Sequence, residues 1–180
     1  MRIVAGTAKG IRLAAVPGGT RPLADRAREG LFSSLGEAVV GARVLDLFAG
    51  TGAVGIEALS RGAAHATFVD ANPAAVRAVR ENLDRAGLAG RATVLRRDAR
   101  KALRAALGPF DLVILDPPYG VAPAALDAVV ATIDAERLVA AGGLVVLTRP
   151  ARGYTPVIPL DWRSDRQLSY GDAVILVYRV

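Results

Sequence analysis

FDLVILDPPYG, residues 110–120, is the stretch that determines how the rest of the chain can be arranged. Residues 112–115 are apolar and rich in Val and Ile, and such a short run predicts a strand buried on both faces rather than a helix. Asp116 is followed by two prolines, which lack an N–H and hold Asp116 extended. The stretch therefore predicts a buried strand of an α/β sheet that ends in an open corner of acid, carbonyl and aromatic ring.

This corner, formed by Asp116, Pro117, Pro118 and Tyr119, has the chemistry to hold an exocyclic amine of a nucleobase for methylation. The lone pair of such an amine is delocalised into the ring, so the nitrogen must pyramidalise before it can attack. The Asp116 carboxylate and the Pro117 carbonyl can accept its two N–H bonds, and Tyr119 can stack on a base that has left its helix. A plain strand-ending turn is the alternative, but the position after a buried strand favours catalysis.

Composition limits the classes of protein that the chain can belong to. Its 180 residues, 52% of them hydrophobic, suit one globular domain. Because there is no cysteine, disulfides, thiolate nucleophiles and Cys-based zinc sites are excluded. His65 lies between alanines, which is typical of a solvated loop, and no metal cluster is visible. No apolar run approaches a membrane span or a signal peptide, so we expect a cytoplasmic protein.

Positive charge is concentrated near the N-terminus. Residues 1–28 carry six basic groups and one acid, whereas the other 152 residues carry a net charge of only +1 out of the total of +6. A basic segment on a nearly neutral body is typical of a surface that binds a polyanion such as RNA, although the charge could also simply be solvated. The candidate RNA-binding residues are Arg2, Lys9, Arg12, Arg21, Arg26 and Arg28.

The order of expected elements defines the fold class. A small hairpin is expected over residues 3–5 and 11–16, followed by an amphipathic helix from Leu23 to Ala38 with Arg26, Arg28 and Glu29 on its polar side. After Gly41, βα units repeat, which predicts a parallel sheet with helices on both faces. Residues 167–170 and 173–178 are expected to form a closing antiparallel pair. The predicted strands cover residues 43–48, 66–69, 92–95, 112–115 and 144–147, and the predicted helices cover 53–61, 73–86, 99–107 and 124–133.

Glycines and acids follow the first three strands, where open α/β sheets bind their ligands. The Asp46 carboxylate is expected to bind the cationic amino end of S-adenosylmethionine. Asp70 is expected to accept hydrogen bonds from the ribose hydroxyls, and Asp98 from the adenine amine. Asp70 and Asp98 could instead cap helices, and Gly50, Gly52 and Gly55 also satisfy G-x-G-x-x-G, so a nicotinamide enzyme is a competitor. Glu57 and Glu81 are expected to be solvated. The candidate cofactor-binding residues are Asp46, Phe48, Ala49, Gly50, Thr51, Gly52, Asp70, Ala71, Asp98 and Ala99.

Four motifs, DLFAGTG (46–52), VDAN (69–72), RRDA (96–99) and DPPY (116–119), resemble those of class I S-adenosylmethionine-dependent methyltransferases. The N-terminal MRIVAG, TRP, DRARE and LF and the late YGD resemble the RsmD-type bacterial enzymes that methylate N2 of a guanine in 16S rRNA. Leu23-Ala24 departs from that family, which usually has two threonines there.

The resemblance implies a Rossmann-like fold with a mostly parallel seven-stranded sheet and an antiparallel C-terminal strand. It also implies S-adenosylmethionine as methyl donor and 16S rRNA or the 30S subunit as partner. We expect a monomeric single domain, with an RNA-binding part at residues 1–40 and a catalytic core at 41–180.

The expected reaction is direct displacement, in which the base nitrogen attacks the methyl group in line. Because DPPY suits any exocyclic amine, an adenine-N6 methyltransferase acting on DNA or RNA is an alternative. A non-catalytic RNA-binding module is an alternative of another class, against which the intact DPPY and glycines argue. The target nucleotide, and whether naked RNA or an assembled subunit is the substrate, are not determined by the sequence.

Overall fold

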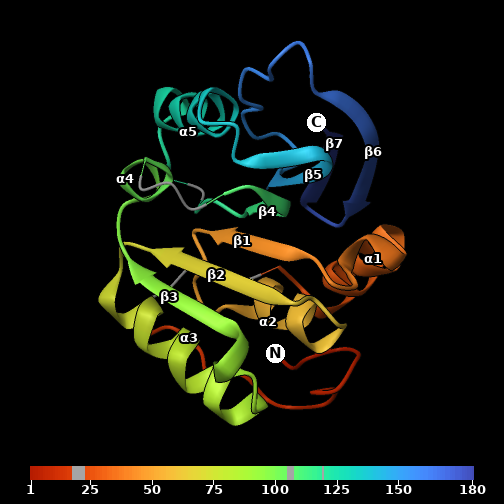
Figure 1. Ribbon diagram of the computed structural model, residues 1–180, viewed down its shortest axis with the longest axis vertical. Helices are drawn as coiled ribbons and strands as arrows, with labels where there is room; N and C mark the ends of the chain where they lie inside the picture. Colours follow the sequence, from red (N-terminus) through yellow and green to blue (C-terminus); the bar gives the residue numbers. More distant parts are fainter. Residues whose placement is uncertain (18–22, 105–107, 119) are drawn as a thin grey trace.

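A single seven-stranded sheet organises the computed structural model, which describes residues 1–17, 23–104, 108–118 and 120–180 (Figure 1). The strand order is β3-β2-β1-β4-β5-β7-β6. The pairs from β3 to β5 are parallel, whereas β7 is antiparallel to both β5 and β6. The strands are β1 (Arg43–Leu47), β2 (His65–Asp70), β3 (Ala92–Arg96), β4 (Phe110–Leu115), β5 (Val139–Pro150), β6 (Arg163–Tyr170) and β7 (Ala173–Arg179). The expected mostly parallel sheet with an antiparallel C-terminal strand is confirmed.

Helices cover both faces of this sheet, as the repeated βα units predict. They are α1 (Asp25–Leu35), α2 (Ala53–Ser60), α3 (Pro73–Ala86), α4 (Ala99–Leu103) and α5 (Pro123–Ala135), with short 3-10 helices at Gly36–Val39 and Ala89–Arg91. The helix expected to run to Ala38 ends earlier, because Gly36 has a φ of 53°. The helix expected over 99–107 is α-helical only to Leu103, and residues 105–107 lie outside the described part of the chain.

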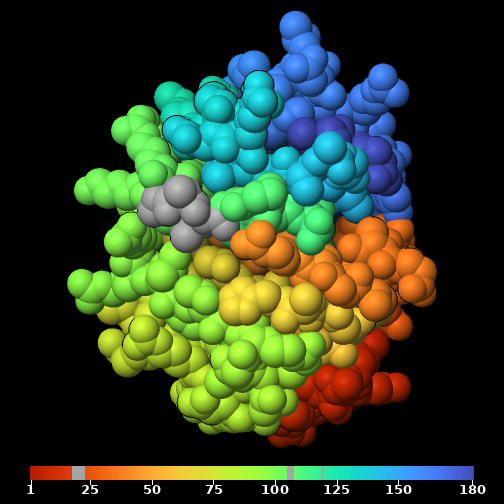
Figure 2. All heavy atoms as spheres, viewed as in Figure 1, coloured from red at the N-terminus to blue at the C-terminus, as the bar shows by residue number. Residues whose placement is uncertain are grey.

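The N-terminal part, by which we mean the described residues between 1 and 28, packs directly on α2 and α3. The expected hairpin exists as a single bridge between Arg2 and Arg12, with Ile3 N–H donating to the Ile11 carbonyl (3.0 Å), but no continuous strands form. Glu57 of α2 accepts from the backbone N–H groups of Val4 (2.8 Å) and Ala5 (3.0 Å). In Figure 2, the red N-terminal part lies beside the yellow-green surface of α3. The basic N-terminal part is therefore built onto the sheet's helical layer.

Two sequence expectations about charged residues are wrong. Glu57, expected to be solvated, is 0% exposed, because the N-terminal part covers it and uses both carboxylate oxygens. Arg28, expected to bind RNA, is also 0% exposed. Its guanidinium donates to the carbonyls of Leu23 (3.1 Å) and Arg2 and pairs with Asp25 (3.1 Å). Arg28 therefore fixes the chain around α1 and is removed from the RNA-binding set.

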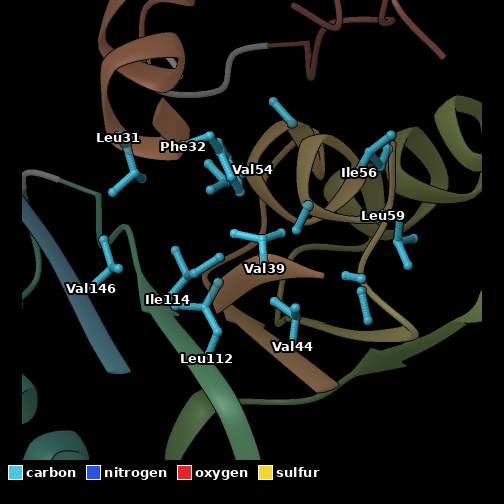
Figure 3. Close-up of a cluster of buried hydrophobic side chains, with 14 of the residues drawn as sticks. Leu31, Phe32, Val39, Val44, Val54, Ile56, Leu59, Leu112, Ile114 and Val146 are labelled. Atoms are coloured by element: carbon cyan, nitrogen blue, oxygen red, sulfur yellow. The ribbon is translucent and has the colours of Figure 1, made fainter. Parts of the chain in front are cut away.

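Two hydrophobic clusters, one on each side of the sheet, hold the layers together. The alternation of a β-strand divides β4 between them: Leu112 and Ile114 face α1 and α2, whereas Val113 and Leu115 face the side of α4 and α5. Figure 3 shows Leu31 of α1 pointing toward the β4 side chains. β4 is thus buried on both faces, as predicted, and its end lies in the middle of the sheet, between β1 and β5.

Candidate active site

A cleft of about 1090 Å³ lies where the parallel strands end. Single small-molecule sites commonly measure about 300–1000 Å³, so this cleft has room for a cofactor together with part of a second substrate. It lies where the sequence predicted, at the carboxyl ends of the parallel strands. Its walls come from residues 48–51, 53–54, 69–72, 75, 97–99, 116–118 and 148–150, together with Val16, Leu23, Ala24, Ala27, Tyr170, Asp172 and Ala173.

The loop after β1 makes a sharp turn beside this cleft. Gly50 and Gly52 have φ values of 56° and 76°, which side-chain-bearing residues rarely adopt, and Gly52 leads into α2. Phe48 has a φ of 62° without being glycine, a strained conformation that costs on the order of 1–3 kcal/mol and is concentrated at functional sites. Phe48, Ala49, Gly50 and Thr51 all line the cleft, whereas Gly52 does not. The turn thus presents backbone to the cleft at close range.

Asp46 lies beneath this loop and does not line the cleft. It is 1% exposed, and its Oδ2 accepts from the Gly55 N–H (2.9 Å) in the first turn of α2. Burial raises the pKa of its carboxyl well above the ordinary value; the Gly55 hydrogen bond opposes this shift, and the charges of Asp116 and Asp70 add to it. The expected direct contact with the amino end of a cofactor is therefore corrected: Asp46 fixes the start of α2 and the loop above it.

Asp70 and Asp98 both face the cleft, as do their neighbours Ala71 and Ala99. Asp70 joins two loops, because its carboxylate accepts from the N–H groups of Gly50 (2.9 Å) and Asn72 (2.8 Å). The helix α3 is capped by Asn72 instead. Asp98 caps α4 through the Lys101 N–H (3.3 Å). Since a carboxylate offers about four acceptor sites, both acids can still accept from hydroxyl or amine groups in the cleft.

Asp116, Pro117 and Pro118 form the wall of the cleft at the end of β4, and Tyr119 lies outside the described residues. Asp116 is partly exposed, and its Oδ1 accepts a hydrogen bond from the Thr148 hydroxyl. Burial raises the pKa of the Asp116 carboxyl, and the Thr148 hydrogen bond partly lowers it. The predicted acid and carbonyl are thus in the same cleft as the glycine loop and the two acids.

Thr148 and Arg149 are among the polar cleft residues that sequence reasoning did not single out. Thr148 is 5% exposed and follows Leu147, which pairs with Leu115 in the neighbouring strand, so the register places Thr148 beside Asp116. A polar residue directly after an apolar run was the signal that could have found it. Arg149 also lines the cleft and donates to the carbonyls of Pro150 (2.9 Å) and Ala151 (3.0 Å).

Four of the candidate RNA-binding residues, Arg2, Lys9, Arg12 and Arg26, are exposed, and Arg21 lies outside the described residues. The N-terminal part reaches the cleft itself, because Val16, Leu23 and Ala24 line it. Within the described part of the chain, no group of three or more His, Cys, Asp or Glu side chains could hold a metal ion. No described helix is long and apolar enough to cross a membrane.

Comparison with known proteins agrees with this geometry. The family model described as Conserved hypothetical protein 95 matches residues 1–179. A putative rRNA methyltransferase, YlbH, of Bacillus subtilis is 38% identical over 99% of this chain and 98% of its own length. Ribosomal RNA small subunit methyltransferase D of Escherichia coli is 33% identical, with 99% and 89% covered.

A solved structure, that of the putative methyltransferase yhhF from Escherichia coli, is similar over nearly the whole chain. It superimposes with a TM-score of 0.87 at 32% identity, covering 99% of this chain and 97% of the other. The resemblance stated from the motifs is thus confirmed along the whole sequence: the chain belongs to the Conserved hypothetical protein 95 family, the family of the RsmD-type rRNA methyltransferases.

Proposed function

We propose that this protein transfers a methyl group from S-adenosylmethionine to the exocyclic N2 amine of a guanine in 16S rRNA. One observation carries the proposal: the Asp116-Pro117 corner and the glycine loop with Asp70 and Asp98 line one cleft. Relatives named as small-subunit rRNA methyltransferases support 16S rRNA as the substrate. The four exposed cations of the N-terminal part fit a polyanionic partner.

The residues around the glycine loop suit this cofactor. Backbone of Phe48 to Thr51 forms a turned surface against which a ligand can lie, and Asp70 and Asp98 offer carboxylate oxygens to the ribose hydroxyls and the adenine amine. When bound, S-adenosylmethionine supplies an electrophilic methyl group on a positively charged sulfur. The acids that line the cleft, Asp70, Asp98 and Asp116, suit a cationic ligand better than a pyrophosphate, which argues against a nicotinamide cofactor.

The chain's own contribution to catalysis is to hold the amine. The Asp116 carboxylate and the Pro117 carbonyl accept its two N–H bonds, so the nitrogen lone pair is directed away from the ring plane. Partial burial strengthens this electrostatic contact relative to water. As the new N–C bond forms and the S–C bond breaks, the nitrogen becomes acidic, and Asp116 accepts its proton or relays it to solvent. Thr148 fixes the carboxylate that does this.

Radiolabelled methyl transfer to free 16S rRNA, small-subunit particles and DNA, followed by digestion to nucleosides, tests the proposal. We expect label in N2-methylguanosine. Label in N6-methyladenosine, or only in DNA, would overturn the choice of base and substrate, and absence of transfer to every substrate would favour a binding module.

Asp116→Ala tests the role of the corner. This variant should bind S-adenosylmethionine as the wild type does and lose most turnover, because the amine loses a charged acceptor. Asp84→Ala removes an exposed acid of α3 and is the matched control, for which normal turnover is expected. Full activity of Asp116→Ala would refute the assigned role.

A further inference from the structure

A second basic segment, residues 96–104, is as concentrated in charge as the N-terminal part. It carries five basic groups and one acid in nine residues, a net charge of +4. Residues 1–28 carry +5, so the remaining 143 residues carry a net charge of −3. All of the positive excess of the chain is therefore in these two segments. The basic residues of the second segment are Arg96, Arg97, Arg100, Lys101 and Arg104.

The local structure directs these cations outward. Ala102 and Leu103 of α4 are 0% exposed, whereas Arg100, Lys101 and Arg104 are exposed. Long light-green side chains project at the left edge of Figure 2, where Figure 1 places α4. Among the ion pairs of the described residues, none involves a cation of this segment. The charges are thus available to a partner. We call Arg96, Arg97, Arg100, Lys101 and Arg104 the α4 basic surface.

This surface begins at the wall of the active-site cleft. Arg97, Asp98 and Ala99 line the cleft, and α4 follows without a break. The N-terminal part contributes Val16, Leu23 and Ala24 to the same cleft. Both basic segments therefore contribute residues to the walls of the cleft that a substrate base would enter.

We propose that the α4 basic surface binds the phosphate backbone of the RNA strand next to the target nucleotide. The inference rests on the proposed function and extends it. A base that leaves its helix to enter a cleft keeps phosphates on both its 5′ and its 3′ side, so the polyanion continues in two directions from the entrance. Two separate basic segments, each contributing residues to the cleft wall, suit a polyanion that continues in two directions. The exposed side chains of α4 are cations without aromatic rings, which suits phosphate contacts rather than base stacking.

The test is the salt dependence of RNA binding by Arg100→Gln/Arg104→Gln. The matched control is Arg77→Gln/Arg80→Gln, which removes the same charge from exposed positions of α3. Binding to a fluorescent 16S rRNA transcript is measured between 50 and 300 mM KCl, on the order of the range over which counterion release dominates. If both arginines contact phosphates, the slope of the logarithm of the binding constant against the logarithm of the salt concentration should become less steep by roughly 1.4 to 1.8. The affinity for the transcript near 0.1 M salt should fall by roughly 25- to 60-fold. Affinity for S-adenosylmethionine and thermal stability should not change.

Three outcomes would overturn the inference. One is unchanged RNA binding by the α4 variant. Another is an equal loss in the α3 control, which would indicate bulk charge only. The third is a loss of activity on small-subunit particles with normal binding to free rRNA, which would indicate a ribosomal protein as the partner. Failure of the proposed function is distinguishable, because it would appear as wild-type protein that binds rRNA without methylating it.

Discussion

Replacing Thr148 by valine tests how the catalytic acid is held. Thr148 is 5% exposed, and its hydroxyl donates to Oδ1 of Asp116. Valine has almost the same shape, so the change removes the hydrogen bond and little else. The Asp116 carboxylate would then be free to turn, and its pKa should rise further, because the hydrogen bond that lowers it is lost.

The size of the effect follows from this one contact. A hydrogen bond to a charged group contributes about 1.5–3 kcal/mol. If the orientation it provides is needed to hold the amine, the rate of methyl transfer should fall roughly 10- to 150-fold, since 1.36 kcal/mol corresponds to about tenfold. The acid limb of the pH–rate profile should also move to higher pH, because the ionised carboxylate is the form that accepts from the amine.

Single-turnover methyl transfer with saturating donor, measured across the pH range, provides the assay. Thr132→Val is the control, because it removes the same hydroxyl at a position in α5 that does not line the cleft. The Thr132 hydroxyl donates one hydrogen bond, to the Ala128 carbonyl (2.6 Å), which the variant loses. Its rate and profile should match those of the wild type. A Thr148→Val enzyme with wild-type rate and an unmoved acid limb would refute the idea that the hydroxyl positions Asp116.

Other positions give predictions for stability. Glu57→Gln breaks a buried charged network and should lower the free energy of unfolding, measured by denaturant titration, by about 3–5 kcal/mol. The control Glu81→Gln breaks an exposed ion pair and should change that free energy by less than about 0.5 kcal/mol. Equal effects of the two variants would contradict the structure. Gly30→Ala would place a Cβ 1.6 Å from the Tyr170 hydroxyl, so despite better helix propensity it should destabilise by about 1–3 kcal/mol, with rescue by Tyr170→Ala. Burial raises the folded-state pKa of Asp116, so the unfolded chain binds fewer protons than the folded chain above a pH of about 4. The contribution of this group to the free energy of unfolding should therefore fall as the pH rises from about 4 toward neutrality. Asp116→Asn should weaken that pH dependence, and an unchanged dependence would count against the raised pKa.

The sheet and the cleft could be predicted because their signals are local. A run of apolar residues that ends in Asp116 or Asp70 gives both a strand and the position of its carboxyl end. Parallel strands bring those ends to one edge, so the cleft follows from the order of elements alone. The glycines of the loop report a backbone conformation directly, since their positive φ values exclude most other residues.

The residues that were assigned wrongly depend on packing between distant segments. The periodicity of α1 places Arg28 on its polar side, but that side is covered by residues 1–5, which no local pattern reveals. Glu57 is buried for the same reason. Asp46 was expected to touch a ligand because it precedes the glycine loop, yet alternation turns its side chain toward α2. In each case, burial depends on a neighbour that the sequence does not identify.

The N-terminal part and the cofactor loop are joined by one buried side chain. Asn82 of α3 is 0% exposed; its Oδ1 accepts from the Ala14 N–H (2.7 Å), and its Nδ2 donates to the carbonyls of Ala14 (3.2 Å) and Thr51 (2.9 Å). Losing one of these partners would leave a buried polar group unpaired, at a cost of about 1–3 kcal/mol. Thr51 belongs to the loop that lines the cleft, and exposed Arg12 is only two residues from Ala14. RNA bound at the N-terminal cations would therefore contact a segment whose position is coupled to that of the cofactor loop. The N-terminal part is thus packed onto the core through Asn82 and is not a separate flexible extension.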